Sequence, residues 1–362
     1  MISGYKYLDK AQRPKELSMT KVSDIARMIK SLSAEDVVEL KSLLLSFEVE
    51  TSCDMEPFLT EERFAKGREC PRCGCTHVVR NGHRFDGTQR YACKGCGKSF
   101  VITSNTIVEG TRKNLDVWRK FMACMMHGMS IRETAAECGI HRNTAFYWRH
   151  KVLDALRKMM AGRVLDGIVE MDETFFDVSY KGNHKKGDFE MPRAPHKRGG
   201  HTDLRGVSHE KVCVPCAISR AGLAYAKSAN LGRASAKSIE SAFGSVISSD
   251  SILVTDKHNA YVRFANKGGH DLVQLKGKAS RKGIYNVQRI NAYHGSLKRF
   301  MRNFDGVSTK YLDNYLAWHA FLSYGKDEVS DRIAALARNV LSERLTVRCR
   351  DISGRNPLPM SA

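Results

Sequence analysis

The sequence predicts a mixed α/β or α+β protein in which a cysteine-rich ribbon and a helical region precede a larger α/β domain. Three observations predict this class. Two cysteine pairs lie within 67–103, helical periodicity dominates 110–160, and apolar strand-like runs are interleaved with helical segments over 165–325. A chain of 362 residues accommodates this organisation at roughly 100–200 residues per domain.

Composition and charge narrow the class of partner. Hydrophobic residues make up 42% and charged residues 27%, which excludes a largely disordered chain. Lys and Arg outnumber Asp and Glu by 59 to 39, so the formal net charge is +20 and a polyanion is the expected partner. Nucleic acid is the commonest such partner, and a membrane surface is the alternative. We see no run of about 18 apolar residues and no apolar signal core in the first twenty, so we expect a cytoplasmic protein without membrane contact.

Residues 1–66 form the first predicted segment. The stretch 19–50 is helical in pattern, and Ser33 followed by Asp36 three residues later is typical of a helix start. The stretch 51–66 is polar and acidic, and we interpret it as a link to the cysteine cluster.

The segment 67–103 predicts a structural zinc site. Cys70 and Cys73 form one CxxCG turn, and Cys93 and Cys96 form a second after 19 intervening residues. Four thiolates at this spacing suit Zn²⁺ and leave no position open for water. Free thiols are the alternative, and Cys75 and His77 are spare ligand candidates. Six surrounding Lys and Arg residues favour contact with DNA.

A third CxxC pair, Cys213 and Cys216, lies in a strand-like run. Residues three apart on a strand face opposite sides, so we expect two buried cysteines rather than a metal or redox pair.

The segment 110–160 predicts a helix-turn-helix. A short helix after Ser130 leads to a turn at Gly139 and then to a second helix. Arg142, Asn143 and Arg149 are the residues that we expect to contact DNA. An ordinary helical hairpin is the alternative.

The segment 165–325 carries two isolated carboxylates on predicted strands. Strands are expected at 167–176, 211–218 and 251–255, and helices at about 234–247, 286–304 and 308–324. Asp172 lies late in the first strand and Asp256 follows the third. Two such strands side by side would present oxygen ligands for Mg²⁺ (or Mn²⁺), and two such ions are a common means of phosphoryl transfer. Strand-end Asp is also common as a simple cap.

A third group of candidates lies on the helix expected at 286–304. At about 100° per residue, Asn291, His294 and Lys298 share one face. That face would offer an amide oxygen to a metal and a cation to phosphate. The segment 261–310 is strongly basic, with eleven Lys and Arg against Asp271 and Asp305. The stretch 181–205, rich in Gly, Lys, Arg and His, is interpreted as a long loop or arm, and 326–362 as a C-terminal tail.

Over about 60–325 the chain resembles the DDE-type insertion-sequence transposases, in particular the family numbered fifteen ninety-five. The resemblance rests on the order of ribbon, helical region and Asp…Asp…Asn with Lys seven residues later, and on several short motifs. These are Val169-Glu-Met-Asp172-Glu-Thr-Phe-Phe, Pro195-His-Lys-Arg-Gly-Gly, Val254-Thr-Asp256, Ala260-Tyr, Val287-Gln-Arg-Ile-Asn291, Ser296-Leu-Lys298, and the run from Gly306 to Trp318.

This resemblance implies a ribonuclease H-like catalytic domain. It also implies an enzyme that binds terminal inverted repeats, cleaves the element ends and joins the 3′-OH ends to target DNA. Asp172 and Asp256 would be metal ligands and Lys298 would contact phosphate. Asn291 stands where most members have Glu, so the site has one negative charge fewer unless Glu173 or His294 compensates; we expect Glu173 to face the other side of its strand.

Two other functions stay open at this point: a non-catalytic regulator that uses only the ribbon and the helix-turn-helix, and a nuclease or decayed transposase that cannot join DNA. Because transposition brings two DNA ends together, the resemblance also implies a homo-oligomer in a synaptic complex.

Overall fold

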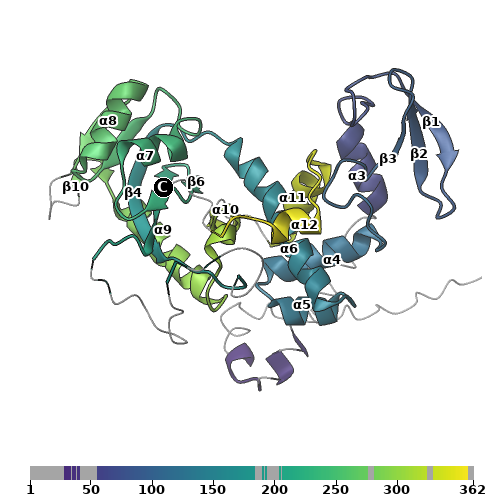
Figure 1. The fold of residues 1–362 in the computed structure, drawn as a ribbon, viewed down its shortest axis with the longest axis horizontal. Coiled ribbons are helices and arrows are strands. Elements are labelled where there is room, and N and C mark those ends of the chain that lie inside the picture. Colours follow the sequence, from purple (N-terminus) through teal and green to yellow (C-terminus); the bar gives the residue numbers. More distant parts are fainter. Residues whose placement is uncertain are drawn as a thin grey trace, which may run out of the picture. The chain divides into compact units, whose positions relative to one another are not determined.

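The computed structural model describes residues 28–33, 35–37, 39–40, 55–183, 190, 192–193, 204, 206–275, 281–323 and 329–357 (Figure 1). The chain divides into two compact units, Met1–Thr51 and Ser52–Ala362. In the first unit, the Asp36 amide donates to Ser33 Oγ at 3.1 Å, and Asp36 Oδ2 accepts from the Ser33 amide at 3.2 Å. The predicted helix start at Ser33 is therefore confirmed. Residues 19–27 and 41–50, and most of the predicted arm 181–205, lie outside the described residues.

The second unit contains a six-stranded sheet. Its strands are β4 (Ile168–Asp177), β5 (Lys211–Ser219), β6 (Ala224–Ala226), β7 (Asn230–Leu231), β8 (Ile252–Thr255) and β9 (Asp271–Gln274). Their order is β6-β5-β4-β8-β9, with β7 also paired to β5. The pairs β4–β5 and β5–β6 are antiparallel, whereas β4–β8 and β8–β9 are parallel. This mixed sheet with helices on both faces agrees with the predicted ribonuclease H-like α/β domain.

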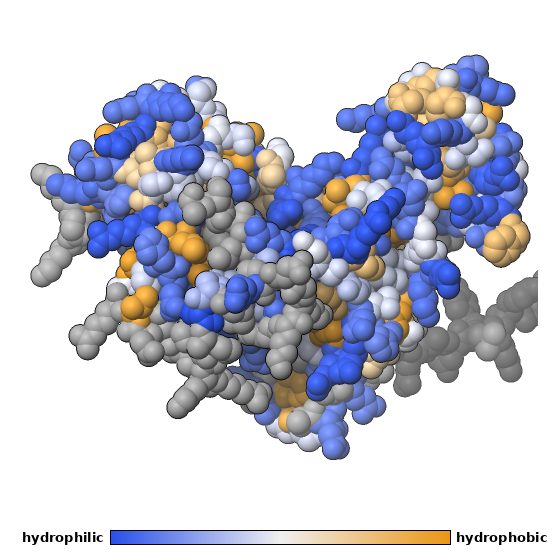
Figure 2. Space-filling model, viewed as in Figure 1, coloured by the Kyte–Doolittle hydropathy of each residue, from blue (hydrophilic) through white to orange (hydrophobic). Residues whose placement is uncertain are grey.

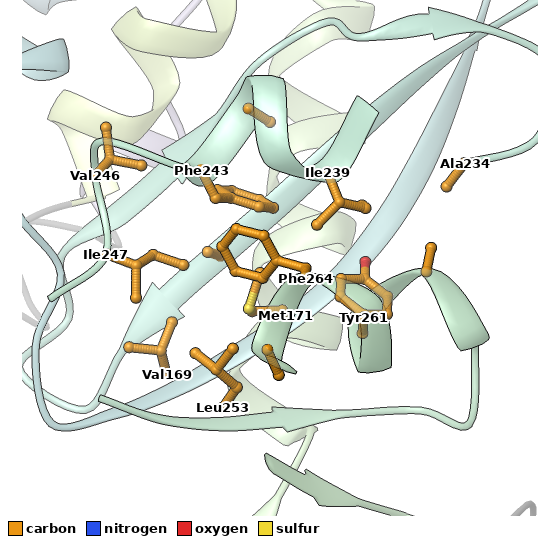
Figure 3. Packing of buried hydrophobic residues seen from close by; sticks show 14 of the residues in the cluster. Val169, Met171, Ala234, Ile239, Phe243, Val246, Ile247, Leu253, Tyr261 and Phe264 are labelled. Carbon is orange, nitrogen blue, oxygen red and sulfur yellow. The ribbon is translucent and has the colours of Figure 1, made fainter. Parts of the chain in front are cut away.

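Alternation along β4 separates the two faces of the sheet. Val169 and Met171 point toward α7 (Ala236–Phe243) and α8 (Asn259–Gly268), where they join Ile239, Phe243 and Phe264 in a buried cluster (Figure 3). Glu170 and Asp172, one residue out of phase, face α9 (Gln288–Arg302). The helix α10 (Leu312–Ser323) packs against α9, β6 and α6. The sequence predicted α7, α9 and α10 to within a few residues but gave no helix at α8.

The cysteine-rich segment forms a three-stranded antiparallel ribbon. Its strands are β1 (Val78–His83), β2 (Gln89–Cys93) and β3 (Ser99–Val101). The ring of Tyr91 stacks on Phe100 at 5.6 Å and meets the edge of Phe64 at 5.1 Å. A small strand pair, β10 (Arg281–Lys282) with β11 (Tyr285–Asn286), precedes α9.

The helical region consists of α4 (Leu115–Met126), α5 (Ile131–Glu137) and α6 (Arg142–Ala161). A capping box between Ser130 and Glu133 begins α5, and Gly139 at φ 57° allows the turn into α6. The predicted helix pair is therefore present at the predicted place.

Two segments differ from the sequence prediction. The acidic link 51–66 contains a helix, α3 (Met55–Phe64), whose Met55 and Leu59 are buried. The predicted tail 326–362 contains α11 (Val329–Ser342) and α12 (Cys349–Ser353), and α11 packs on α3, α4 and α6. Both helices form because apolar residues recur at helical spacing and find a neighbouring surface to cover.

Candidate functional site

The two aspartates meet at the carboxyl ends of neighbouring parallel strands. In the β4–β8 register, Glu170 is opposite Val254. Asp172 follows Glu170 by two residues, and Asp256 follows Val254 by two residues. Both carboxylates therefore come to the same edge of the sheet. Asp172 Oδ1 accepts from the Glu173 amide at 2.9 Å, and Asp256 Oδ1 accepts from the His258 amide at 3.0 Å. The strand register thus places the two carboxylates side by side, and each of them accepts a hydrogen bond from a backbone amide.

Glu170 holds the start of α9 against β4. Its carboxylate is fully buried, and Oε2 accepts from the amides of Arg289 and Ile290 at 2.9 and 3.2 Å. Arg220 lies 3.4 Å from the other carboxylate oxygen. A negative charge at a helix N-terminus satisfies amides that have no intrahelical partner. Sequence analysis missed this residue, although a charged side chain two positions before Asp172 in a buried strand is a signal for it.

The helix α9 brings its polar face to Asp172. His294 Nδ1 lies 3.7 Å from Asp172 Oδ2. Asn291 is exposed one turn before His294, and Lys298 is exposed one turn after it. The predicted shared face of Asn291, His294 and Lys298 is thus the face at the sheet edge. Burial, with a contribution from Lys298, lowers the pKa of His294 to about 4, so its imidazole is neutral at pH 7.

The electrostatics of this edge suit a cation. Burial, together with the nearby carboxylates of Glu173 and Asp256, raises the pKa of Asp172 to about 7, against the opposing effects of the Glu173 amide and Lys298. Glu173 itself faces the other side of β4, where Tyr261 of α8 donates to its carboxylate at 2.8 Å. Two oxygen-bearing side chains that repel one another at one edge match the donor set of Mg²⁺ or Mn²⁺.

The four predicted cysteines come together at the base of the ribbon. The sulfur atoms of Cys70, Cys73, Cys93 and Cys96 all lie within 4.8 Å of one another. Cys70 and Cys96 are 3.8 Å apart and Cys73 and Cys93 are 3.6 Å apart, close to the roughly 3.8 Å that tetrahedral Zn–S bonds of about 2.3 Å require. The Cys96 amide donates to Cys93 Sγ, and this bond, together with the neighbouring thiols and the Gly95 amide, lowers the pKa of the Cys93 thiol to about 6. The residues present therefore fit a zinc ion.

Cys75, His77, Cys213 and Cys216 lie outside this cluster. Cys75 packs against Gly95 between the two turns, where a Cβ on residue 95 would come within 2.8 Å of its sulfur. His77 is exposed. Cys213 and Cys216 are both buried, the first in the cluster under α7 and α8 and the second beside Asp172 in the β4–β5 register. The prediction that this pair faces opposite sides of a strand is confirmed.

The predicted DNA contacts of α6 divide into two groups. Arg142 and Asn143 are exposed at the start of the helix. Arg149 is only 2% exposed, its Nη2 donates to the Met129 carbonyl at 2.8 Å, and its guanidinium lies 5.5 Å from the Trp318 ring. The prediction that Arg149 contacts DNA from the surface is therefore wrong. It occupies the same face of α6 as Ala145 and Val152, which are also buried.

The tip of the β1–β2 hairpin presents a residue that the sequence did not single out. Phe85 is 105% exposed, and Arg84 beside it is exposed as well. Two backbone hydrogen bonds stabilise the turn. The Arg84 amide donates to the Thr88 carbonyl at 2.9 Å, and the Gly87 amide donates to the Arg84 carbonyl at 3.1 Å. On the face shown in Figure 2, hydrophilic residues predominate and hydrophobic ones are scattered. Among the described helices, none is long and apolar enough to cross a bilayer.

Comparison with known proteins gives two informative matches. Residues 164–322 match the family model of the ISXO2-like transposase domain. A protein of Halobacterium salinarum, described as an uncharacterized protein in transposable element ISH50, is 31% identical over 156 residues, which cover 42% of this chain and 49% of that protein. The chain thus spans about half the length of this relative.

Two solved structures are matched more distantly. They are the Mos1 mariner paired end complex with Mn, at 12% identity over 61% of this chain and 75% of that one, and a pre-cleavage Mos1 transpososome, at 9% identity over 60% and 76%. Their TM-scores of 0.23 and 0.21 are too low to show a shared fold. The family match instead coincides with the α/β domain that carries Asp172 and Asp256. Residues 164–322 are thus similar to the ISXO2-like transposase domain family.

Proposed function

We propose that the protein is a DDE-type transposase with Asn at the third position, which binds the terminal inverted repeats of an insertion sequence, cleaves the element ends and joins the 3′-OH ends to target DNA. The observation that carries this proposal is the meeting of Asp172 and Asp256 with the polar face of α9, within the domain that matches the transposase family. A regulator that only binds DNA has no need of convergent carboxylates at a sheet edge.

The chain's own residues have distinct roles in this proposal. Asp172, Asp256 and Asn291 would hold divalent cations through carboxylate and amide oxygens. When bound, a pair of Mg²⁺ or Mn²⁺ ions would neutralise charge on the reacting phosphate and lower the pKa of the attacking water. Lys298 offers its ammonium to a DNA phosphate. Glu170 fixes the start of α9, so Asn291 and Lys298 keep their place relative to Asp172.

The DNA would be held by the ribbon and the helix pair. In the ribbon, Zn²⁺ on the four cysteines would stabilise a hairpin that carries Arg80, Arg84 and Arg90, with Phe85 at its tip. A two-stranded ribbon fits a DNA groove, and an exposed aromatic side chain can insert between base steps. On α6, Arg142 and Asn143 stand at the end of the helix that enters a groove in such motifs. A homo-oligomer would hold two ends together in a synaptic complex.

The test uses the full chain with DNA that carries the repeats flanking its gene. In Mg²⁺, we expect cleavage at the element ends and covalent joining to a target plasmid, read on a denaturing gel. Cleavage without joined product would instead indicate a nuclease or a decayed transposase. Binding with neither product would indicate a regulator and would overturn the proposal.

A further inference from the structure

A cavity of about 530 Å³ lies between the DNA-binding helices and the α/β domain. One wall comes from α5 and α6, and the other comes from the loop after α9 and the start of α10. It is separate from the carboxylates of Asp172 and Asp256, neither of which lines it. Its lining combines aromatic rings, buried polar side chains and lysines.

Aromatic rings form a continuous wall of this cavity. The centroid of the His150 ring lies 4.0 Å from that of Tyr311, and Phe146 lies 5.8 Å from Tyr311 and 5.6 Å from Tyr147. Phe146 and Tyr147 are only half-buried, so the wall offers ring surface to an occupant. A planar base stacks well on such a surface, whatever its identity.

Two buried polar side chains in the lining have unused donors. Arg149 is 2% exposed and His150 is 1% exposed. In the part of the chain that the structure describes, Arg149 Nε and His150 Nε2 have no hydrogen-bond partner, and no carboxylate is within ion-pair distance of Arg149. The Asn314 amide lies 3.5 Å from His150 Nδ1, which leaves Nε2 as the protonated nitrogen. A buried guanidinium without an anion is costly, so acceptor atoms of a ligand would stabilise it.

Lysines at the rim add positive charge. Lys181 is exposed, and its ammonium donates to the carbonyls of Asp305 and Gly306 at 3.0 and 2.9 Å. Lys310 also lines the cavity, with its ammonium 5.1 Å from the Tyr311 ring. Cations beside an aromatic wall match a phosphate joined to a base.

We propose that this cavity binds one unstacked nucleotide of the bound DNA. Its base would lie on the rings of Phe146, Tyr147 and Tyr311, its acceptor atoms would receive the Arg149 and His150 donors, and its phosphate would contact Lys181. This inference rests on the proposed function, because it requires that the chain binds DNA.

The helix α6 links the cavity to the proposed DNA contacts. Arg142 and Asn143 are exposed at its start, and Phe146 and Arg149 follow within two turns. At a rise of 1.5 Å per residue, Asn143 and Arg149 are only about 9 Å apart along the helix axis. A duplex that Asn143 contacts would therefore pass close to the cavity, within reach of a base that has left the stack.

The test compares three duplexes of one sequence. The first is fully paired, the second carries one extra, unpaired 2-aminopurine, and the third carries an abasic residue at the same place. We expect the full-length protein to bind the 2-aminopurine bulge roughly tenfold more tightly than the abasic bulge, the effect of stacking one base. The fluorescence of 2-aminopurine should fall on binding, because the base stacks on the aromatic rings. Equal affinity for the two bulges would overturn the site.

Variants separate this site from the general DNA interface. Arg149→Gln and Lys181→Ala should reduce the preference for the 2-aminopurine bulge while affinity for paired DNA stays within about twofold. Lys267→Ala, which removes a similar exposed cation from α8, should leave both affinities unchanged. If Arg149→Gln unfolds the protein, Lys181→Ala and the abasic comparison decide the question. If the protein binds all three duplexes equally well, the cavity site alone is overturned. If it binds none of them, the proposed function is overturned as well.

Discussion

The ribbon and the sheet edge gather their chemical groups in opposite ways. The ribbon takes four thiols from two short turns between Cys70 and Cys96, and without an ion only the small apolar cluster of Phe64, Val78, Tyr91 and Phe100 remains to hold it. The sheet edge takes Asp172, Asp256 and the α9 side chains from three distant segments, placed by strand register and a buried glutamate. The first site should therefore depend on its metal for folding, and the second should exist before any metal arrives.

The largest expected effect is loss of the ribbon on zinc removal. Chelation, or Cys73→Ser, should unfold 70–100, because thiolate binding supplies about 10–16 kcal/mol in comparable peptides. All three tryptophans, Trp118, Trp148 and Trp318, lie outside the ribbon and report on the rest of the protein. We expect their unfolding transition to persist while backbone amides of the ribbon exchange freely.

Cys75→Ser is the matched control for this prediction. Its sulfur lies outside the cluster of four, so the variant should keep its zinc and its ribbon. Full zinc content in Cys73→Ser, measured by metal analysis, would contradict the ligand assignment.

The next largest effect is the loss of stability expected when Glu170, which holds α9 at the sheet edge, is removed. Glu170→Ala leaves two helix amides without their acceptor and Arg220 without its ion-pair partner, so we expect a loss of about 3 kcal/mol in the free energy of unfolding, measured with urea. Glu240→Ala removes an exposed ion pair with Lys267 and should cost less than about 1 kcal/mol. Similar values for the two variants would show that Glu170 does not position α9.

Local motifs and long-range placement also differ in how far the sequence predicts them. The CxxCG turns and the strand-end aspartates are visible in the sequence because a few neighbouring residues determine them. The strand order is not visible, since pairing of β4 with β8 depends on the whole sheet. A charge in a buried strand marks Glu170 as unusual, but its partners are 119 and 120 residues away, so the sequence does not show what it binds.

The burial of Arg149 and the helix within 326–362 are, by contrast, indicated by the spacing of apolar residues in the sequence. Arg149 lies four residues after Ala145 and three before Val152, so the helical period already places it on the buried face. In 326–362, Ile333, Leu336, Ala337, Val340 and Leu341 recur at helical spacing and are buried. By contrast, the cavity beside α6 needs two domains in contact, which no local pattern indicates.

Substitutions of Asn291 test whether α9 supplies the third metal ligand of the sheet-edge site. Asn291→Ala should reduce strand transfer by at least about a hundredfold, comparable to the loss of one group that stabilises a transition state. Asn291→Asp keeps the shape and adds a charge, so it should retain activity and lower the Mg²⁺ concentration required. If Asn291 only occupies the helix surface, Ala should be tolerated, with stability changed by less than about 0.5 kcal/mol. Full activity of Asn291→Ala would move the search for a third ligand to His294, because Glu173 faces the other side of β4.

The smallest effect is expected at Lys298. Lys298→Ala should lower the slope of log affinity against log salt concentration by about one phosphate contact. The same change at Lys267, on the opposite side of the sheet, should leave the slope unaltered. An unchanged slope for Lys298→Ala in a titration of DNA binding would remove this residue from the DNA interface.

Cleavage of terminal DNA by Asp172→Asn and Asp256→Asn tests the central claim most directly. Each substitution keeps the shape of the side chain and removes one charged oxygen ligand at the sheet edge. Binding should persist because the ribbon and α6 are untouched, and cleavage in Mg²⁺ should be abolished in both variants. Retained cleavage by either variant, with binding equal to that of the unaltered protein, would contradict the assignment of the active site to this edge.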